Sequence, residues 1–392
     1  MVARRLSREF NLLAASCRWP ASRERDAEIR RLTAEELRWN AFIDLVKRHR
    51  VEGLVHRAFT EAQAECPIEV ARFLAVRAEA IVTQSLIQAA AAMRLKESLA
   101  ERNLDFLFLK GATLGILAYE TLSVKQAWDI DLLVAPDQAV QAAAVLQEAG
   151  YNRTHPTAEL SESQFADWMF YCKESLWTRS DGTVVELHTA LVDNPRLLAG
   201  ISARSPSQEV SVGPGTLPTL RRNELFAYLC VHGATHGWAR LKWLADVAAL
   251  LRKQPAGEIE TMYRHAQQLG SGRSAAQALL LCARLLALDL PSRLRGELAR
   301  DGRTQWLVNL ALGAMVGHGA TELDDTVFGT VGINASHLFL ARGLGFKMSE
   351  LGRKLSNAED RLIVRLPKPL TFLYPVIAVP LWVWRRYRMT RA

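Results

Sequence analysis

The segment from Trp128 to Val134 (WDIDLLV) carries two carboxylates one residue apart inside an otherwise apolar run. Alternate residues of a β-strand point to the same face, so we expect Asp129 and Asp131 to project together, about 7 Å apart along the strand. Two like charges side by side at a buried strand are costly unless a cation lies between them. Hard oxygen ligands favour Mg²⁺, with Mn²⁺ as the alternative, and Mg²⁺ commonly comes with a phosphate-bearing substrate. The motif therefore predicts a metal site that serves a phosphate compound.

The bulk properties of the chain limit its class without choosing a partner. Its 392 residues suffice for two or three domains, and its net charge of +8 suits anionic substrates, nucleic acid or an anionic membrane surface. DNA- and RNA-binding motifs are absent, so a nucleic-acid partner is not expected. The five cysteines are widely spaced without a C-x-x-C pair, and the first residues lack the apolar stretch of a signal peptide. These features predict a cytoplasmic protein with reduced thiols.

The C-terminal segment is apolar and then basic. It has no charged residue from Leu370 to Trp384, and an arginine-rich run follows from Arg385. The apolar stretch is shorter than the about 20 residues that a membrane-spanning helix needs, and Pro375 and Pro380 interrupt it. We expect a tail packed on the body of the protein. The alternative is a weak membrane-surface contact through Leu370 to Arg388, where tryptophans lie beside arginines.

Periodicity and turn signals divide the chain into three parts. We predict an N-terminal helical region over residues 1–103, an α/β core over 104–219 and a C-terminal helical domain over 220–392. The strands expected in the core are 105–110, 129–134, 151–154, and a hairpin of 170–177 with 183–188. The helices expected between them are 112–120 and 136–148. The fold class is therefore α+β, a small mixed β-sheet with helices packed on it.

Capping signals place several helix ends. Thr33-Ala-Glu-Glu predicts a capping-box start, and Pro67 is expected to open a long helix that runs to about residue 99. Asn223 is expected to cap a helix that continues through Trp238. Residues 313–332 are rich in glycine and acidic side chains and predict a loop.

Three elements of the core together predict phosphate chemistry. Lys110-Gly111-Ala112-Thr113 forms a turn before a helix, where backbone N–H groups and the helix dipole favour phosphate and the glycine allows a close approach. Asp129 and Asp131 can hold two Mg²⁺ ions, one on a triphosphate and one on an acceptor hydroxyl. Glu186, on a later strand, would hold the acceptor-side metal or take the acceptor's proton. Such a set can transfer a nucleotidyl group by attack on the α-phosphorus, with pyrophosphate leaving.

A basic group lies further along the chain. His232, His236 and Arg240 recur at intervals of four and would share one helix face if the helix continued. With Lys242 they are candidates for lining the cleft and binding phosphates. The histidine pair is also compatible with zinc, although the glutamate of an H-E-x-x-H motif is absent, and with an ordinary helix interface.

The ordered motifs resemble those of the DNA polymerase β-like nucleotidyltransferase superfamily, and more closely those of the bacterial uncharacterised nucleotidyltransferase family. The segments that carry the resemblance are Leu109–Ala112 (LKGA), Trp128–Val134, Glu148–Tyr151 (EAGY), Glu186–His188 (ELH) and His232–Asp246. The resemblance implies a Mg²⁺-dependent enzyme that moves a nucleoside monophosphate from an NTP such as ATP to a hydroxyl or phosphate of a small molecule, sugar or peptide. It also implies a natural-product or polysaccharide biosynthetic setting.

The chain departs from the superfamily pattern at two of these positions. Ala112 stands where a serine is usual, which leaves Thr113 as the alternative source of a hydroxyl, and Glu186 stands where an aspartate is commoner. Two other functions therefore stay open. One is a non-catalytic member of the same fold that binds nucleotide or a partner, and the other is a toxin-like enzyme that nucleotidylates a protein or tRNA.

Overall fold

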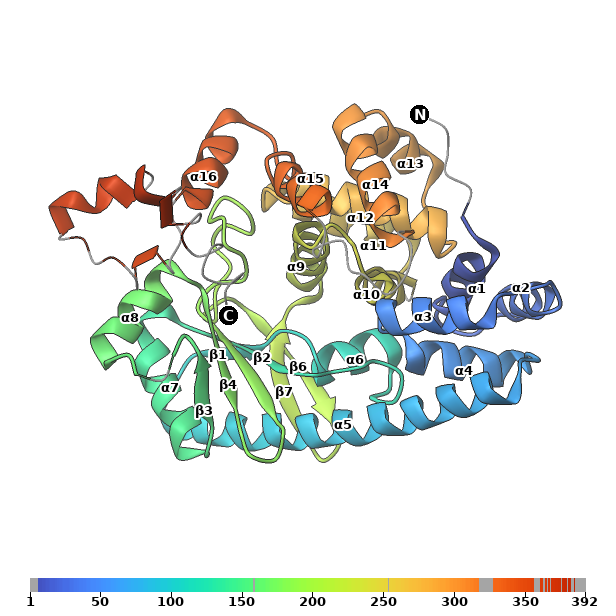
Figure 1. The fold of residues 1–392 in the computed structure, drawn as a ribbon, viewed down its shortest axis with the longest axis horizontal. Coiled ribbons are helices and arrows are strands. Elements are labelled where there is room, and N and C mark those ends of the chain that lie inside the picture. The colour runs from blue at the N-terminus through green and yellow to red at the C-terminus, as the bar shows by residue number, and fades with distance from the viewer. Residues whose placement is uncertain are drawn as a thin grey trace.

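The N-terminal part of the chain is helical. The computed structural model describes residues 6–157, 159–252, 254–316 and 327–355, together with separate residues between 360 and 384. The first five helices are α1 (Arg8–Ser16), α2 (Arg23–Thr33), α3 (Trp39–His49), α4 (Glu52–Ala62) and α5 (Ile68–Glu101). In Figure 1, α5 runs along the base of the molecule from these helices to the β-sheet, so one long helix spans both parts.

Two of the predicted helix starts have different outcomes. Pro67 is the N-cap of α5, as predicted, and the 34 residues of α5 contain no further proline and no glycine. The capping box predicted at Thr33 is wrong, because Thr33 is the last residue of α2 and its hydroxyl donates to the Arg30 carbonyl at 3.2 Å. The next helix, α3, begins at Trp39 without a side-chain cap.

The α/β core contains a five-stranded mixed sheet, which confirms the predicted fold class. Its strands are β1 (Phe106–Phe108), β2 (Ile130–Val134), β3 (Asn152–His155), β4 (Glu174–Thr178) and β5 (Val184–His188). They lie in the order β1-β2-β5-β4-β3, and the central pair β2–β5 is parallel while the other pairs are antiparallel. The parallel pair is long-range in sequence, so it brings residues near 130 beside residues near 186.

The remaining elements of the core cover and extend this sheet. They are α6 (Ala112–Tyr119), the short 3₁₀ helix η1 (Pro136–Gln138), α7 (Ala139–Glu148), α8 (Glu162–Tyr171), and a separate hairpin of β6 (Ser207–Val212) and β7 (Gly215–Leu220). Sequence patterning placed residues 170 and 171 in a strand, but they end α8, whose start is fixed by a capping box at Ser161. The hairpin β6–β7 was not predicted, although a Gly-Pro-Gly turn marks it.

Helices return after the hairpin. They are α9 (Arg222–Thr235), α10 (Leu241–Arg252), α11 (Ala256–Gln268), α12 (Gly272–Leu285), α13 (Ser292–Ala299), α14 (Gly302–Met315), α15 (Val327–His337) and α16 (Leu344–Lys354), followed by η3 (Lys368–Leu373). The predicted cap Asn223 lies inside α9, whose N-cap is Arg221. The loop predicted over 313–332 is partly wrong, since Gly332 lies in α15, and residues 317–326 are outside the described part.

The C-terminal segment is described only in part. Among the described residues, no helix is long and apolar enough to cross a membrane. The basic residues from Arg385 onward fall outside the described part of the chain, so the weak membrane-surface contact stays a prediction. The division into three domains also stays a prediction.

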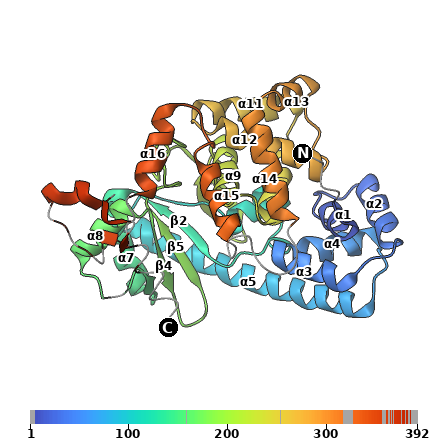
Figure 2. The same cartoon turned by 45° about the horizontal axis from the view of Figure 1, so that its top comes forward.

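Two hydrophobic cores hold the fold together. One joins the N-terminal helices to α6 and the C-terminal helices, and the other lies between the sheet and the helices α5, α7 and α8. Figure 2 shows the C-terminal helices above the strand ends of the sheet. Helix α6 and strand β2 contribute side chains to both cores, as Leu117 and the pair Leu132 and Leu133 illustrate. The start of β2 is therefore held from both sides.

A buried ion pair links α10 to the segment before β2. The Asp246 carboxylate lies 2.7 Å from Lys125 Nζ and accepts a hydrogen bond of 2.9 Å from the Tyr119 hydroxyl. Replacing Asp246 with Asn leaves the buried Lys125 ammonium without a counter-charge, so we expect the free energy of unfolding to fall by about 3 kcal/mol. Urea denaturation measures the change. Asp289→Asn, at an exposed position, is the matched control, and equal midpoints for the two variants would contradict the prediction.

Candidate active site

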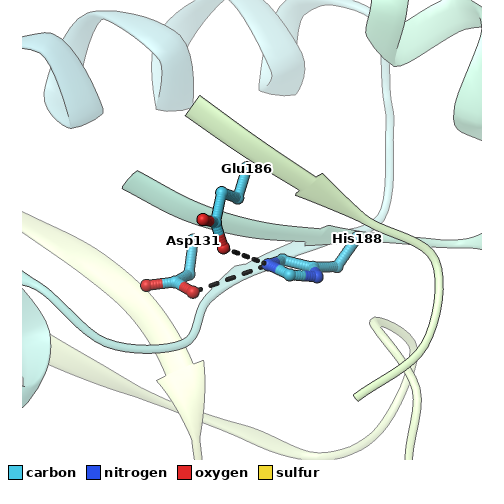
Figure 3. A group of neighbouring side chains, drawn as sticks. All are labelled: Asp131, Glu186 and His188. Atoms are coloured by element: carbon cyan, nitrogen blue, oxygen red, sulfur yellow. Dashed lines mark ion pairs between the residues drawn. The ribbon is translucent and has the colours of Figure 1, made fainter. Parts of the chain in front are cut away.

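Three side chains converge where the parallel strands β2 and β5 run side by side. The register places Asp131 opposite Glu186, and His188 follows Glu186 by two residues on the same strand face. One ligand atom from each of the three lies within 4.8 Å of the others (Figure 3). His188 Nε2 is 3.5 Å from an oxygen of Asp131 and 3.5 Å from an oxygen of Glu186. Two carboxylates and one imidazole are a donor set that can bind a divalent metal.

The Asp131 carboxylate is the buried centre of this group. It is 3% exposed, and Lys110 Nζ lies 2.7 Å from its Oδ1. Burial alone would raise the pKa of Asp131, but the charges of Lys110 and His188 outweigh burial and hold the pKa below its ordinary value. Burial lowers the pKa of His188, and the carboxylates of Asp131 and Glu186 reverse that effect and raise it. The Lys110 ammonium thus occupies a position where a cation is strongly favoured.

Asp129 lies just before β2 and lines the same cleft. It is only half-buried, and it is not a member of the metal-ligand group found among the described residues. Burial, with the nearby charges of Asp131 and Glu186, raises its pKa. Sequence reasoning grouped Asp129, Asp131 and Glu186 at one metal site, whereas the structure groups Asp131 and Glu186 with His188 and leaves Asp129 outside that group. The cause is the long-range pairing of β5 with β2. Glu186 and His188 point to the same face of β5, and this pairing brings both of them to Asp131.

The glycine turn lies beside these carboxylates. Gly111 has φ +61° and ψ −125°, a conformation that side-chain-bearing residues rarely adopt, and it is the N-cap of α6 without a side-chain cap. A Cβ atom at Gly111 would lie 3.6 Å from the Asp129 carbonyl oxygen. The start of α6 therefore has no side-chain cap and lies beside Asp129, so its first N–H groups are candidates for binding an anion.

Two residues of the predicted phosphate turn lie apart from the cleft lining. Thr113 is buried, and its hydroxyl donates to the Lys110 carbonyl at 3.0 Å, so that hydroxyl holds the turn. Ala112 borders a small hollow beside Gly111 and not the main cleft. Lys110 and Gly111 do line the cleft.

The cleft has a volume of about 490 Å³ and is bounded by the sheet on one side and by α9 and α10 on the other. The four basic residues predicted downstream, His232, His236, Arg240 and Lys242, all line it. They do not share one continuous helix, because α9 ends at Thr235 and the chain turns through residues with positive φ at Gly237 and Trp238. The helix predicted to reach Trp238 therefore stops three residues earlier.

Aromatic stacking and charge shape the helical wall of the cleft. The His236 ring stacks on Trp243 with centroids 4.9 Å apart. Burial, with Lys110 nearby, lowers the pKa of His236 to about 4, so this ring is neutral at pH 7. Burial, together with the charges of Lys125 and Arg50, lowers the pKa of Lys242 to about 7. The wall thus carries a lysine whose charge changes near neutral pH.

Sequence reasoning missed several side chains at this site. His188 was not among the residues predicted for the site, although Glu186 and His188 have the same one-residue spacing as the aspartate pair. Glu174 lies opposite His188 in the sheet, with its Oε2 3.7 Å from His188 Nδ1, and Lys173 Nζ lies 2.6 Å from the same Oε2. Only the strand register of β4 and β5 brings these two residues to the cleft.

Comparison with known proteins identifies one family. The sequence model of a family described as "Uncharacterised nucleotidyltransferase" matches residues 35–287, which include every strand of the sheet and helices α9 to α11. In a search of curated proteins, no protein matches the chain.

Proposed function

The chain belongs to the uncharacterised nucleotidyltransferase family, and on that premise we propose that it is a divalent-metal-dependent nucleotidyltransferase. Its substrates would be an NTP and a small molecule, sugar or peptide that offers a hydroxyl or phosphate. Family membership supports NTP-dependent transfer in general. The observation that carries the finer proposal is the Asp131–Glu186–His188 group beside the Gly111 turn, in which Asp131 and His188 are buried, in a cleft lined by basic side chains.

The residues of the cleft have separable tasks in this proposal. The first N–H groups of α6 and the Lys110 ammonium would bind the triphosphate oxygens, and Lys242 would add a positive charge from α10. Asp131, Glu186 and His188, with Asp129 nearby, would hold Mg²⁺ or Mn²⁺, which supplies positive charge to the phosphates and to the acceptor oxygen when bound.

The transfer itself is an in-line displacement. The acceptor oxygen forms a bond to the α-phosphorus while the bond to pyrophosphate breaks, and the acceptor's proton must leave. Glu186 is suited to take that proton, because its side chain is 35% exposed and faces the cleft from the strand beside Asp131. The positively charged walls hold the leaving pyrophosphate.

A direct assay tests the proposal. The purified protein is incubated with each of ATP, CTP, GTP and UTP labelled at the α-phosphate, with MgCl₂ and a panel of sugar, peptide and alcohol acceptors. We expect label transfer and pyrophosphate release that stop when EDTA is added. The variant carrying both Asp129→Asn and Asp131→Asn should lose metal-dependent nucleotide binding by calorimetry. Normal binding and turnover by that variant would contradict the assignment.

One observation favours a second function, a nucleotide-binding member without catalysis. The Lys110 ammonium lies 2.7 Å from Asp131 Oδ1, where it balances that carboxylate without any metal. A member of this kind would bind an NTP as tightly in EDTA as in Mg²⁺ and release no pyrophosphate with any acceptor. Metal-dependent affinity separates the two functions.

Lys242 predicts a specific pH dependence of nucleotide binding. Its pKa of about 7 means that the side chain is charged below that pH and neutral above it, and a bound triphosphate favours the charged form. Raising the pH from 7 to 9 should therefore weaken binding of the preferred NTP by about tenfold or more, since one proton is taken up on binding. Lys242→Arg stays charged over this range and should lose less than about threefold. Equal pH profiles for the two proteins, measured by calorimetry, would contradict the prediction.

A further inference from the structure

A second cavity lies among the C-terminal helices, apart from the catalytic cleft. Its volume is about 480 Å³, and it shares no lining residue with the cleft. Residues of α11, α12, α13 and α14 and the start of α16 form its walls. A volume of this size suits a small organic molecule.

Helix N-termini converge on this cavity. α12 begins at Gly272, α14 at Gly302 and α16 at Leu344, and residues at each start line the cavity. Asp301 caps α14 by accepting a hydrogen bond from Arg303 N at 3.0 Å. The starts of α12 and α16 have no side-chain cap. Uncapped N–H groups and the positive ends of helix dipoles favour an anion.

The arginines at the cavity differ in how they are used. Arg273 is 7% exposed and donates to the carbonyls of Phe339 and Ala341 as well as approaching Asp301, so it is part of the framework. The guanidinium of Arg196 instead lies against Gly345, where a Cβ atom would be 3.3 Å from its Cζ. Within the described part of the chain, this guanidinium has no ion-pair partner. It is therefore a charge that is available to a ligand.

A buried hydroxyl gives an independent indication of a ligand. Thr304 lines the cavity and is 1% exposed, and its hydroxyl has no hydrogen-bond partner among the residues that the structure describes. Leaving such a group unpaired is costly, so buried hydroxyls are nearly always bonded. Tyr263, Leu298 and Phe346 are buried at the same cavity and provide an apolar wall.

We propose that this cavity is a binding site for a small organic oxyanion, a phosphate monoester or carboxylate with an apolar body. The anionic group would lie beside Arg196 and the uncapped N-terminus of α16, and the apolar body against the buried wall. The two acidic residues of the lining do not oppose this, because both are balanced. Glu297 lies 2.6 Å from Arg264, and Asp301 lies 3.1 Å from Arg273.

Calorimetry on the full chain tests the proposal. The probes are phenyl phosphate, benzoate, inorganic phosphate and the neutral benzyl alcohol. We expect saturable binding of phenyl phosphate or benzoate, at least tenfold tighter than inorganic phosphate, and none of benzyl alcohol. The comparison of the two organic anions tells a phosphate ligand from a carboxylate ligand.

Arg196→Ala should weaken binding at least tenfold. Thr304→Val should weaken it without lowering the melting temperature, since the variant removes an unpaired hydroxyl.

Two control variants distinguish anion binding in this cavity from binding in the catalytic cleft and from nonspecific binding to surface arginines. Arg295→Ala removes an exposed arginine that does not line the cavity, and it should bind the probes as the parent protein does. Lys242→Met removes a cation of the catalytic cleft and should also leave this binding unchanged. Absence of saturable binding would overturn the proposal. Binding that survives Arg196→Ala and is lost in Lys242→Met would overturn it too, because the anion would then lie in the cleft.

Discussion

Asp131→Asn is expected to lower the rate of nucleotidyl transfer by about three orders of magnitude, the size of effect seen when a charge that stabilises the transition state is removed. Asp131 is the most buried carboxylate of the candidate group, and it contacts both Lys110 and His188. Its Oδ1 lies 2.7 Å from Lys110 Nζ and 3.5 Å from His188 Nε2, and its Cα pairs with that of Glu186. The neutral amide offers one oxygen and no charge, so metal affinity and the positions of these neighbours change together.

The same substitution also affects folding, and the experiment has to separate the two effects. Loss of the Asp131 charge leaves the buried Lys110 ammonium unbalanced, which destabilises a protein by roughly 3–5 kcal/mol. Glu186→Gln is the companion variant, because its side chain is 35% exposed and, among the residues that the structure describes, no lysine pairs with it. We expect this variant to keep its melting temperature and still lose about a hundredfold or more in kcat. Steady-state kinetics and thermal denaturation are measured on both variants.

The results for Asp131→Asn and Glu186→Gln together either support or contradict the catalytic role of these carboxylates. A Glu186→Gln protein that folds normally and turns over normally would contradict the role given to the β2–β5 carboxylates. Asp289→Asn, at an exposed position, controls for the removal of one negative charge and should match the parent protein in both measurements.

The sequence predicted the local parts of this site well, because they depend on short-range patterns. The aspartate motif and its strand, the glycine turn with its helix, and the strand of Glu186 all follow from alternation and turn chemistry within a few residues. The sequence also predicted that Glu186 joins Asp131, but the inclusion of His188 and the exclusion of Asp129 depend on the register between β2 and the strand beside it. Strand order is set by packing between segments that lie more than fifty residues apart in the sequence. The local sequence of β2 does not determine it.

The end of α9 follows from a local signal that helical periodicity does not detect. α9 stops at Thr235 because Gly237 and Trp238 adopt positive φ, and Trp238 then packs fully buried over Gly233. A Cβ atom at Gly233 would lie 2.3 Å from that indole ring, so a residue one turn back in the helix makes room for the chain reversal. Helical periodicity continues through this point, but Gly237 is a local end signal. Trp238 N donates to the Gly233 carbonyl and Gly237 N to the Ala234 carbonyl, which is the Schellman pattern of a glycine C-cap. His236 and Lys242 reach one cleft by this reversal and not by a shared helix face.

Gly111→Ala has the second largest expected effect, and Gly182→Ala is its matched control. Both glycines have positive φ, +61° for Gly111 and +82° for Gly182, but Gly182 lies in the turn between β4 and β5 with nothing within 4 Å of an added Cβ. Each substitution should therefore lower the free energy of unfolding by a similar amount, about 1–3 kcal/mol.

Only the change at Gly111 should affect the reaction. To relieve its strain the turn must rotate, and the start of α6, which borders the small hollow beside Asp129 and Asp131, would then move away from the position where phosphate oxygens are expected. A displacement of about 1 Å at a substrate-positioning group costs about a hundredfold in rate. We therefore expect kcat/KM to fall about a hundredfold in Gly111→Ala and to stay within twofold in Gly182→Ala, while the two melting temperatures fall together. Equal kcat/KM for the two variants would mean that the glycine turn serves folding alone, and the phosphate-binding task would then have to be reassigned to the lysines of the cleft.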